Sequence, residues 1–154
     1  MADIIAVKSA IINLLKDDEG IKSILGLDSR GQTPVYHSLI QHRIHKPCIT
    51  VEDVTDTGEV SALNDAYDDV SRYEWHLAVI QIDCWSGRGA EERDQIEAAV
   101  QRCLLKGSNQ ASLRSAGIIS IQEPSIQALD EPAHKPPLWR KCLRYRVFYI
   151  LEAS

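Results

Sequence analysis

Four side chains between residues 37 and 48 have the chemistry of zinc ligands: His37, His42, His45 and Cys48. Imidazole nitrogens and thiolates bind Zn²⁺ in structural sites, and such a site is usually closed by four ligands. No second ligand pair follows elsewhere in the chain, and Lys46 and Pro47 would break a helix that aligned these four. We therefore expect polar loop histidines, and neither a metal nor another cofactor.

An acidic segment follows. Between Lys46 and Arg72 the chain has no basic residue and seven acidic ones: Glu52, Asp53, Asp56, Glu59, Asp65, Asp68 and Asp69. The spacing of a calcium-binding loop is absent. A small metal-dependent nuclease would need acids and a lysine that converge at strand ends, and no lysine follows Glu52 and Asp53 within reach in the sequence. A solvated acidic connection is the favoured interpretation, and the nuclease is the competing enzyme class.

A basic segment lies near the other end of the chain. From Lys135 to Arg146 there are five bases and no acid, and Arg140, Arg144 and Arg146 share one face of an expected strand. This face could contact phosphate or the acidic segment of a neighbouring copy. The formal net charge of −5 favours the protein partner. A head-to-tail contact between unlike patches forms a closed ring when the rotation closes.

The glycines and cysteines supply no catalytic signature. Ser86-Gly87-Arg88-Gly89 stands where a strand should turn into a helix, a place where phosphates can bind, but it matches neither dinucleotide-binding nor P-loop spacing. A plain strand-to-helix turn is the simpler interpretation. The four cysteines form no C-x-x-C pair and three fall within apolar patterns, so buried thiols are expected.

Two long helices are expected to position these groups. Residues 3–16 have Ile4, Val7, Ile11 and Leu15 at helical spacing after a possible cap at Asp3. A short second turn follows and ends at Gly26. Residues 90–106 give the clearest amphipathic helix, with acids in its first turn and bases in its last. Residues 107–116 are expected to be a polar loop.

Strand patterns account for most of the remainder. The expected strands are 35–39, 48–54, 72–85, 118–123 and 138–151, with a polar connection over 55–71 and a stiff one over 130–137. The strand 72–85 is apolar on both faces, with Tyr73, Trp75, Leu77 and Val79 on one and Ala78, Ile80, Ile82 and Cys84 on the other. Both faces should therefore be covered, and part of this long strand could project as an arm of a hairpin.

The pattern as a whole predicts one α+β domain over residues 1–154: a mostly antiparallel sheet with two main helices packed on it and long hairpin-like strands. The 44% hydrophobic content suits one core. No apolar run is long enough to span a membrane, and the first residues lack the features of a signal peptide. We expect a protein made in a cytoplasm, with no membrane partner.

The layout resembles the tail-terminator and tail-completion proteins of tailed bacteriophages over nearly the full length. The resemblance is carried by the N-terminal helix that continues into Ile21-Lys-Ser-Ile-Leu-Gly26, by Pro47-Cys-Ile-Thr-Val51, by Val79-Ile-Gln-Ile-Asp-Cys-Trp-Ser86 directly before a helix, and by the closing Arg- and Tyr-rich strand.

The resemblance implies a structural, non-enzymatic virion protein that forms a ring, commonly a hexamer, at the head-proximal end of the tail. Its partners would be other copies, the tail tube protein and the head connector or neck protein, and DNA would pass through the lumen without sequence-specific binding. A head–tail connector or neck subunit is the alternative, and a host-encoded adaptor is a further class.

Two sets of residues would serve such a ring. Ile80, Ile82, Arg140, Arg144 and Arg146 are the expected subunit interface, since a sheet face left bare by one copy can be covered by the next. Asp56, Glu59, Asp65, Asp68 and Asp69 are expected in an acidic loop that lines the lumen or meets the tube, where negative charge discourages DNA from sticking.

Overall fold

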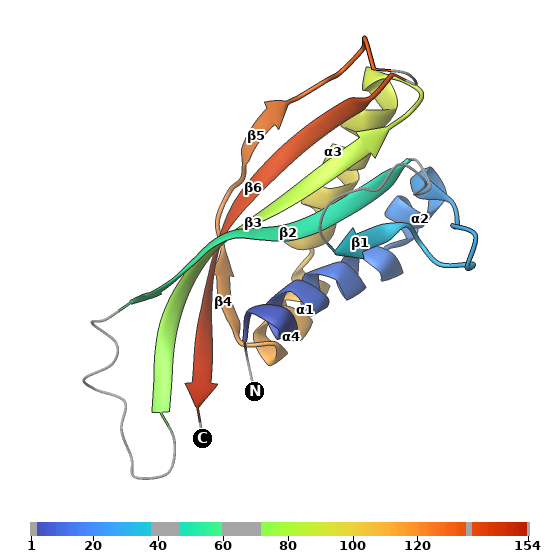
Figure 1. Cartoon of the computed structure of the whole chain (residues 1–154). Coiled ribbons are helices and arrows are strands. Elements are labelled where there is room, and N and C mark those ends of the chain that lie inside the picture. The colour runs from blue at the N-terminus through green and yellow to red at the C-terminus, as the bar shows by residue number, and fades with distance from the viewer. Residues whose placement is uncertain (1–2, 38–46, 60–71, 135–136, 154) are drawn as a thin grey trace.

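The structure, a computed structural model, describes residues 3–37, 47–59, 72–134 and 137–153. Its six strands form one mixed, mostly antiparallel sheet in the order β1-β2-β3-β6-β4, and β5 pairs with β6 beside β4. The strands are β1 Val35–His37, β2 Cys48–Glu59, β3 Arg72–Ser86, β4 Ile118–Ile121, β5 Ser125–Ala128 and β6 Trp139–Ala153. Four helices pack on the sheet (Figure 1), which confirms the predicted α+β class.

The two long helices lie close to where the sequence predicts them. Helix α1 spans Ile4–Asp17, and the Asp3 side chain accepts a hydrogen bond of 2.7 Å from Ala6 N, which caps its first turn. Helix α3 spans Ala90–Leu105 and follows β3 directly. The short helix α2, Glu19–Leu25, is capped by Asp18 and ends at Gly26, whose φ of 69° is the left-handed conformation expected there.

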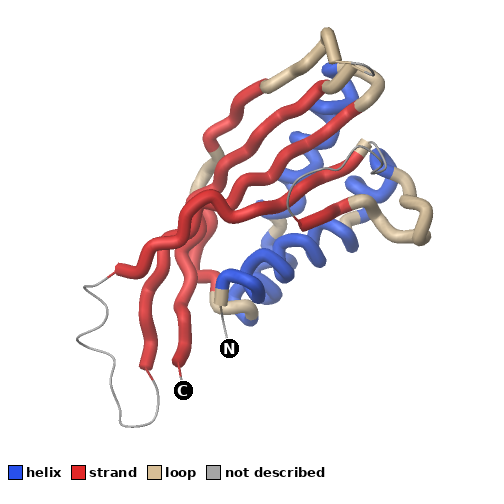
Figure 2. The backbone as a smooth tube through the Cα atoms, viewed as in Figure 1, coloured by secondary structure: helices blue, strands red, loops and turns tan. Residues whose placement is uncertain are grey.

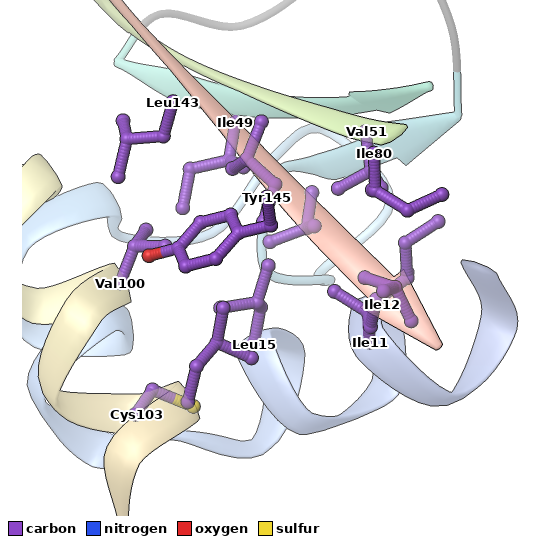
Figure 3. Close-up of a cluster of buried hydrophobic side chains, with 14 of the residues drawn as sticks. Ile11, Ile12, Leu15, Ile49, Val51, Ile80, Val100, Cys103, Leu143 and Tyr145 are labelled. Atoms are coloured by element: carbon purple, nitrogen blue, oxygen red, sulfur yellow. The ribbon is translucent and has the colours of Figure 1, made fainter. Parts of the chain in front are cut away.

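The core lies between these helices and one face of the sheet. Ile11, Ile12 and Leu15 from α1 and Val100 and Cys103 from α3 form one buried cluster with Tyr145 of the central strand β6 (Figure 3). The strands add alternate residues to the same cluster, among them Ile49, Val51, Ile80, Ile82 and Leu143. Burial of this apolar surface is the main favourable term that holds the two layers together.

A fourth helix replaces the predicted polar loop over 107–116. Helix α4 spans Gly107–Ser115 and has one buried residue, Leu113, so it lacks the apolar stripe by which helices are recognised in a sequence. The side chains of Asn109 and Gln110 donate to the carbonyls of Cys103 and Leu104, at 2.8 and 3.1 Å. These bonds satisfy the free end of α3 and dock α4 against it.

Two strand assignments also differ from the sequence prediction. Strand β2 continues to Glu59, so residues 55–59 are paired strand rather than the start of a loop. Strand β5 was not predicted, because all four of its residues are exposed and only pairing with β6 holds it. An exposed strand has no apolar alternation for the sequence to show.

Three strands run on beyond the helices. Residues 55–59 of β2, 72–77 of β3 and 148–153 of β6 remain paired and project past the N-terminal end of α1 (Figures 1 and 2). We call these three segments the arm. The predicted projecting hairpin is thus present, widened by the third strand β6.

Candidate subunit interface

The sheet has one face that the helices do not cover, which we call the open face. On β3 it carries the odd-numbered residues from Trp75 to Trp85, since Ala78, Ile80, Ile82 and Cys84 point into the core. On β6 it carries the even-numbered residues from Arg140 to Ile150, which are the cross-strand partners of that set. The open face therefore has a continuous grid of side chains over both central strands.

The middle of the open face is a buried polar cluster around Gln81. Its amide nitrogen donates to Asp83 Oδ2 at 2.8 Å and, more weakly, to Glu52 Oε1 at 3.4 Å, while its amide oxygen accepts from Arg144 Nε at 3.0 Å. Gln81 and Asp83 are 8% and 1% exposed. Burial, and then the negative charge of Asp83, raises the pKa of Glu52.

An aromatic and a guanidinium group cover one end of this cluster. Trp85 Nε1 donates to Thr50 Oγ1 at 3.0 Å, and the guanidinium carbon of Arg140 lies 4.9 Å from the centre of the Trp85 ring. Stacking of this kind orients the arginine and removes it in part from water. The positive charges of Arg140 and Arg144 also act on Glu52, so these two arginines are partly balanced within the protomer.

Toward the arm the open face becomes apolar. Trp75 lies opposite Ile150 and Leu77 opposite Phe148, and Val79 lies opposite Arg146. Trp75 is 48% exposed and the other four apolar side chains are half-buried, with no helix of the described chain over them. We call Trp75, Leu77, Val79, Phe148 and Ile150 the apolar row. A connected apolar surface on an exposed sheet is a candidate contact with another molecule.

The structure corrects part of the predicted interface. Ile80 and Ile82 are 0% exposed and belong to the core between sheet and helices. A fully buried side chain offers no surface to a second molecule, so these two residues are not compatible with the interface predicted for them. Arg144 and Arg146 are exposed on the open face and Arg140 is half-buried there, as their alternation predicts.

The acidic loop is also changed. Asp56 is not in a loop but in β2, where Tyr149 donates to its Oδ2 at 2.6 Å and His76 Nδ1 lies 2.9 Å from its Oδ1. A bulge between Asp53 and Thr55 shifts the register, which turns Asp56 to the helix side of the sheet. Glu59 is the last residue of β2, and Asp65, Asp68 and Asp69 lie outside the described residues.

The residues that sequence reasoning missed are of two kinds. Phe148 and Ile150 belong to the apolar row. Their even-numbered positions put them on the same strand face as the arginines, so the sequence alternation was enough to place them there. Asp83 and Gln81 stand in a strand that reads as apolar on both faces, so nothing in their spacing indicates a buried polar cluster. That cluster exists because β2 and β6 bring Glu52 and Arg144 to either side of Gln81.

The geometry gives little support to the nuclease and zinc-site alternatives. Glu52 lies on the open face while Asp53 pairs with Lys8 of α1 at 2.6 Å on the other, so the two acids do not converge on one ion. No group of three potential metal ligands occurs among the described residues, and His42 and His45 fall outside them. Cys48, Cys84, Cys103 and Cys142 are all buried, as expected.

The strand-to-helix turn uses its own hydroxyl in place of an external anion. Ser86 Oγ accepts hydrogen bonds from Arg88 N and Gly89 N, at 3.0 and 3.3 Å, and donates to Glu92 Oε1 at 2.8 Å. The amide groups that a bound phosphate would need are therefore occupied within the turn. This geometry supports the interpretation of 86–89 as a plain turn.

An ion cluster ties α3 to the connection between β5 and β6. Arg93 contacts both Asp130 and Asp94, Lys141 Nζ lies 3.0 Å from Asp94 Oδ1, and Arg140 N donates to Asp130 Oδ1 at 3.0 Å. Hydrogen bonding to Arg93 lowers the pKa of Asp130, and hydrogen bonding to Lys141 lowers that of Asp94. The cluster fixes the strand that carries the arginines of the open face.

Asp130→Asn should lower the free energy of unfolding at pH 7 by about 1 to 2 kcal/mol, because it removes a charge-assisted hydrogen bond to a largely buried arginine. Because the pKa of Asp130 is lowered in the folded protein, its ionised carboxylate stabilises the fold at any pH above the ordinary pKa of 3.8. This stabilisation is lost as the pH falls through the pKa of the folded state. Urea unfolding at pH 7 and pH 3 should therefore show the difference between variant and wild type narrowing in acid; an unchanged difference would contradict the assignment.

Comparison with known proteins identifies the fold. The chain is similar to a protein in a solved structure described as "Virion of native gene transfer agent (GTA) particle", with a TM-score of 0.52 and 17% sequence identity over 94% of each chain. No family model matches the sequence, and no curated protein does. At this identity the similarity shows a shared fold. None of the helices in the described ranges is long and apolar enough to cross a membrane.

Proposed function

We propose that this protein is a structural virion component that forms a closed ring at the head-proximal end of a phage-type tail, as a tail terminator. The observation that carries the proposal is the open face: a sheet surface with an exposed tryptophan and further apolar side chains that no helix of the described chain covers. Its fold is shared with a chain of a phage-like virion, which supports the same class.

The physical basis is the burial of that surface between copies. Apolar surface removed from water contributes roughly 25 cal/mol per Å². A ring uses one contact repeated around an axis, and it needs no catalytic group. In the proposed role the ring caps the tail tube and joins it to the head connector, and DNA passes through its lumen. Its net charge of −5 suits a pore through which DNA moves without binding.

Electron microscopy of the purified protein, alone and mixed with purified tail tubes, tests this function. We expect closed rings in the first sample, with the hexamer as the expected number, and rings seated at one end of the tubes in the second. Rings that bind an isolated head connector but no tube end would favour the alternative of a neck subunit. A protein that stays monomeric and joins neither particle would contradict both.

A further inference from the structure

The arm and the arginines of the open face have complementary surfaces. The arm presents Trp75, Leu77, Phe148 and Ile150 on its open face, and Trp75 is the most exposed of these. Farther along the same face, Arg144 and Arg146 are exposed. We call these two side chains the arginine pair. Aromatic rings bind guanidinium groups face to face, and the methylene stems of arginine cover apolar surface.

The charges are also complementary. Among the described residues neither Arg144 nor Arg146 forms an ion pair, and the bond from Arg144 is to the neutral amide of Gln81. In the sequence, β2 ends at Glu59, and the stretch from Glu59 to Asp69 has four acids and no base. Unlike charges on two separate surfaces steer and orient an association.

These surfaces cannot meet within one protomer. The arm and the arginine pair belong to the same sheet, because β3 and β6 run without interruption from the arm into the paired region that carries Gln81 and Arg144. A continuous two-stranded ladder cannot fold back onto its own face. An arm that covers the arginine pair therefore has to belong to another molecule. A second copy of this chain has such an arm.

We propose that the arm of one copy lies across the open face of the next, with Trp75 and Phe148 against the arginine pair. This inference rests on the proposed ring and names its contact. The two surfaces are different, so the interface is head-to-tail, and repetition of a head-to-tail contact closes into a ring when the rotation permits.

Two variants test the two sides of this contact. Trp75→Asp removes the aromatic side of the arm, and the double variant Arg144→Glu with Arg146→Glu reverses the arginine pair. Matched controls change an exposed residue elsewhere in the same way: Ile126→Asp on the edge strand β5, and Arg114→Glu on α4. Circular dichroism and urea unfolding of each protein establish that it is folded before assembly is measured.

Sedimentation of each variant should show folded protomers where the wild type and both controls form rings. A one-to-one mixture of the two assembly variants is the sharper test. The variant with a defective arm keeps its arginine pair and the other keeps its arm, so one contact remains and the mixture should give heterodimers and nothing larger. An isologous interface, in which the same patch meets itself, does not predict this result.

Rings formed by either folded variant would contradict the proposed contact, and so would assemblies larger than the dimer in the mixture. Neither result would contradict the proposed function, because the wild-type protein would still form a ring. Loss of rings in the control variants to the same degree would contradict the contact as well, because the effect would not be specific to it. A wild-type protein that forms no ring would overturn the function and the contact together.

Discussion

Ile82→Ala should lower the free energy of unfolding by about 2 to 5 kcal/mol, the usual cost of deleting a large aliphatic side chain in a core that cannot collapse around the gap. Ile82 is 0% exposed and lies between Val51 of β2 and Leu143 of β6, beneath the helices. Urea unfolding followed by circular dichroism measures the change as a shift of the transition midpoint at unchanged slope.

Val79→Ala is the matched control for this variant. It lies on the same strand, three residues away and on the opposite face, where it is half-buried. Its truncation should cost less than about 1.5 kcal/mol, since a surface position leaves no closed cavity. If Ile82→Ala instead kept its stability and lost only its assembly, the original prediction that Ile82 lies at a subunit interface would be right and the packing described here wrong.

Asp56→Ala should be the next most damaging change, with a cost of about 2 to 3 kcal/mol. Asp56 accepts hydrogen bonds from the hydroxyl of Tyr149 and from His76 Nδ1, and Tyr149 is 1% exposed. Burial and the hydrogen bond to Asp56 raise the pKa of Tyr149. Its hydroxyl therefore stays protonated and donates this hydrogen bond. Removal of the acceptor leaves a buried donor unsatisfied.

A double-mutant cycle with Tyr149→Phe isolates this contact. Tyr149→Phe removes the donor hydroxyl and leaves Asp56 with its contact to His76, so it should cost less than Asp56→Ala. Asp56→Ala should then cost clearly less in the Tyr149→Phe background, with an interaction energy of about 1 to 2 kcal/mol. An acidic side chain in a solvated loop, as the sequence predicts for Asp56, would show costs within about 0.5 kcal/mol and no coupling.

The position of Asp56 also bears on assembly. Asp56, His76 and Tyr149 come from β2, β3 and β6, so the cluster joins all three strands at the base of the arm. A ring contact made by the arm requires that its strands keep their register and direction. We therefore expect residues that fasten this base to affect assembly through the arm's rigidity, and not through contact with a partner.

Periodicity determined much of the fold. Val7, Ile11 and Leu15 recur at helical spacing and became the buried face of α1, and the alternation of Leu143, Tyr145, Val147 and Tyr149 identified the inner face of β6. These patterns are reliable because a helix stripe or a strand face has to be apolar to be buried, whatever it packs against. The α+β class follows from the order of such elements.

Tertiary structure alone decided which apolar face of β3 is covered by the protein's own helices. The sequence shows Trp75, Leu77 and Val79 on one face and Ala78, Ile80 and Ile82 on the other, with nothing to distinguish them. Helices α1 and α3 cover the second face, because their stripes meet it across the core. We therefore propose the subunit interface at the apolar row and no longer at Ile80 and Ile82.

Pairing also decided what local pattern could not show. Strand β5 exists because β6 supplies its hydrogen bonds, and helix α4 docks on the end of α3 through side chains such as Asn109. The bulge after Asp53 turned an acid from an expected loop toward Tyr149. Such outcomes depend on partners far away in the chain, such as Glu52, Gln81 and Arg144 on three different strands. A single sequence records the chemistry of these side chains, and only the folded sheet brings them within bonding distance.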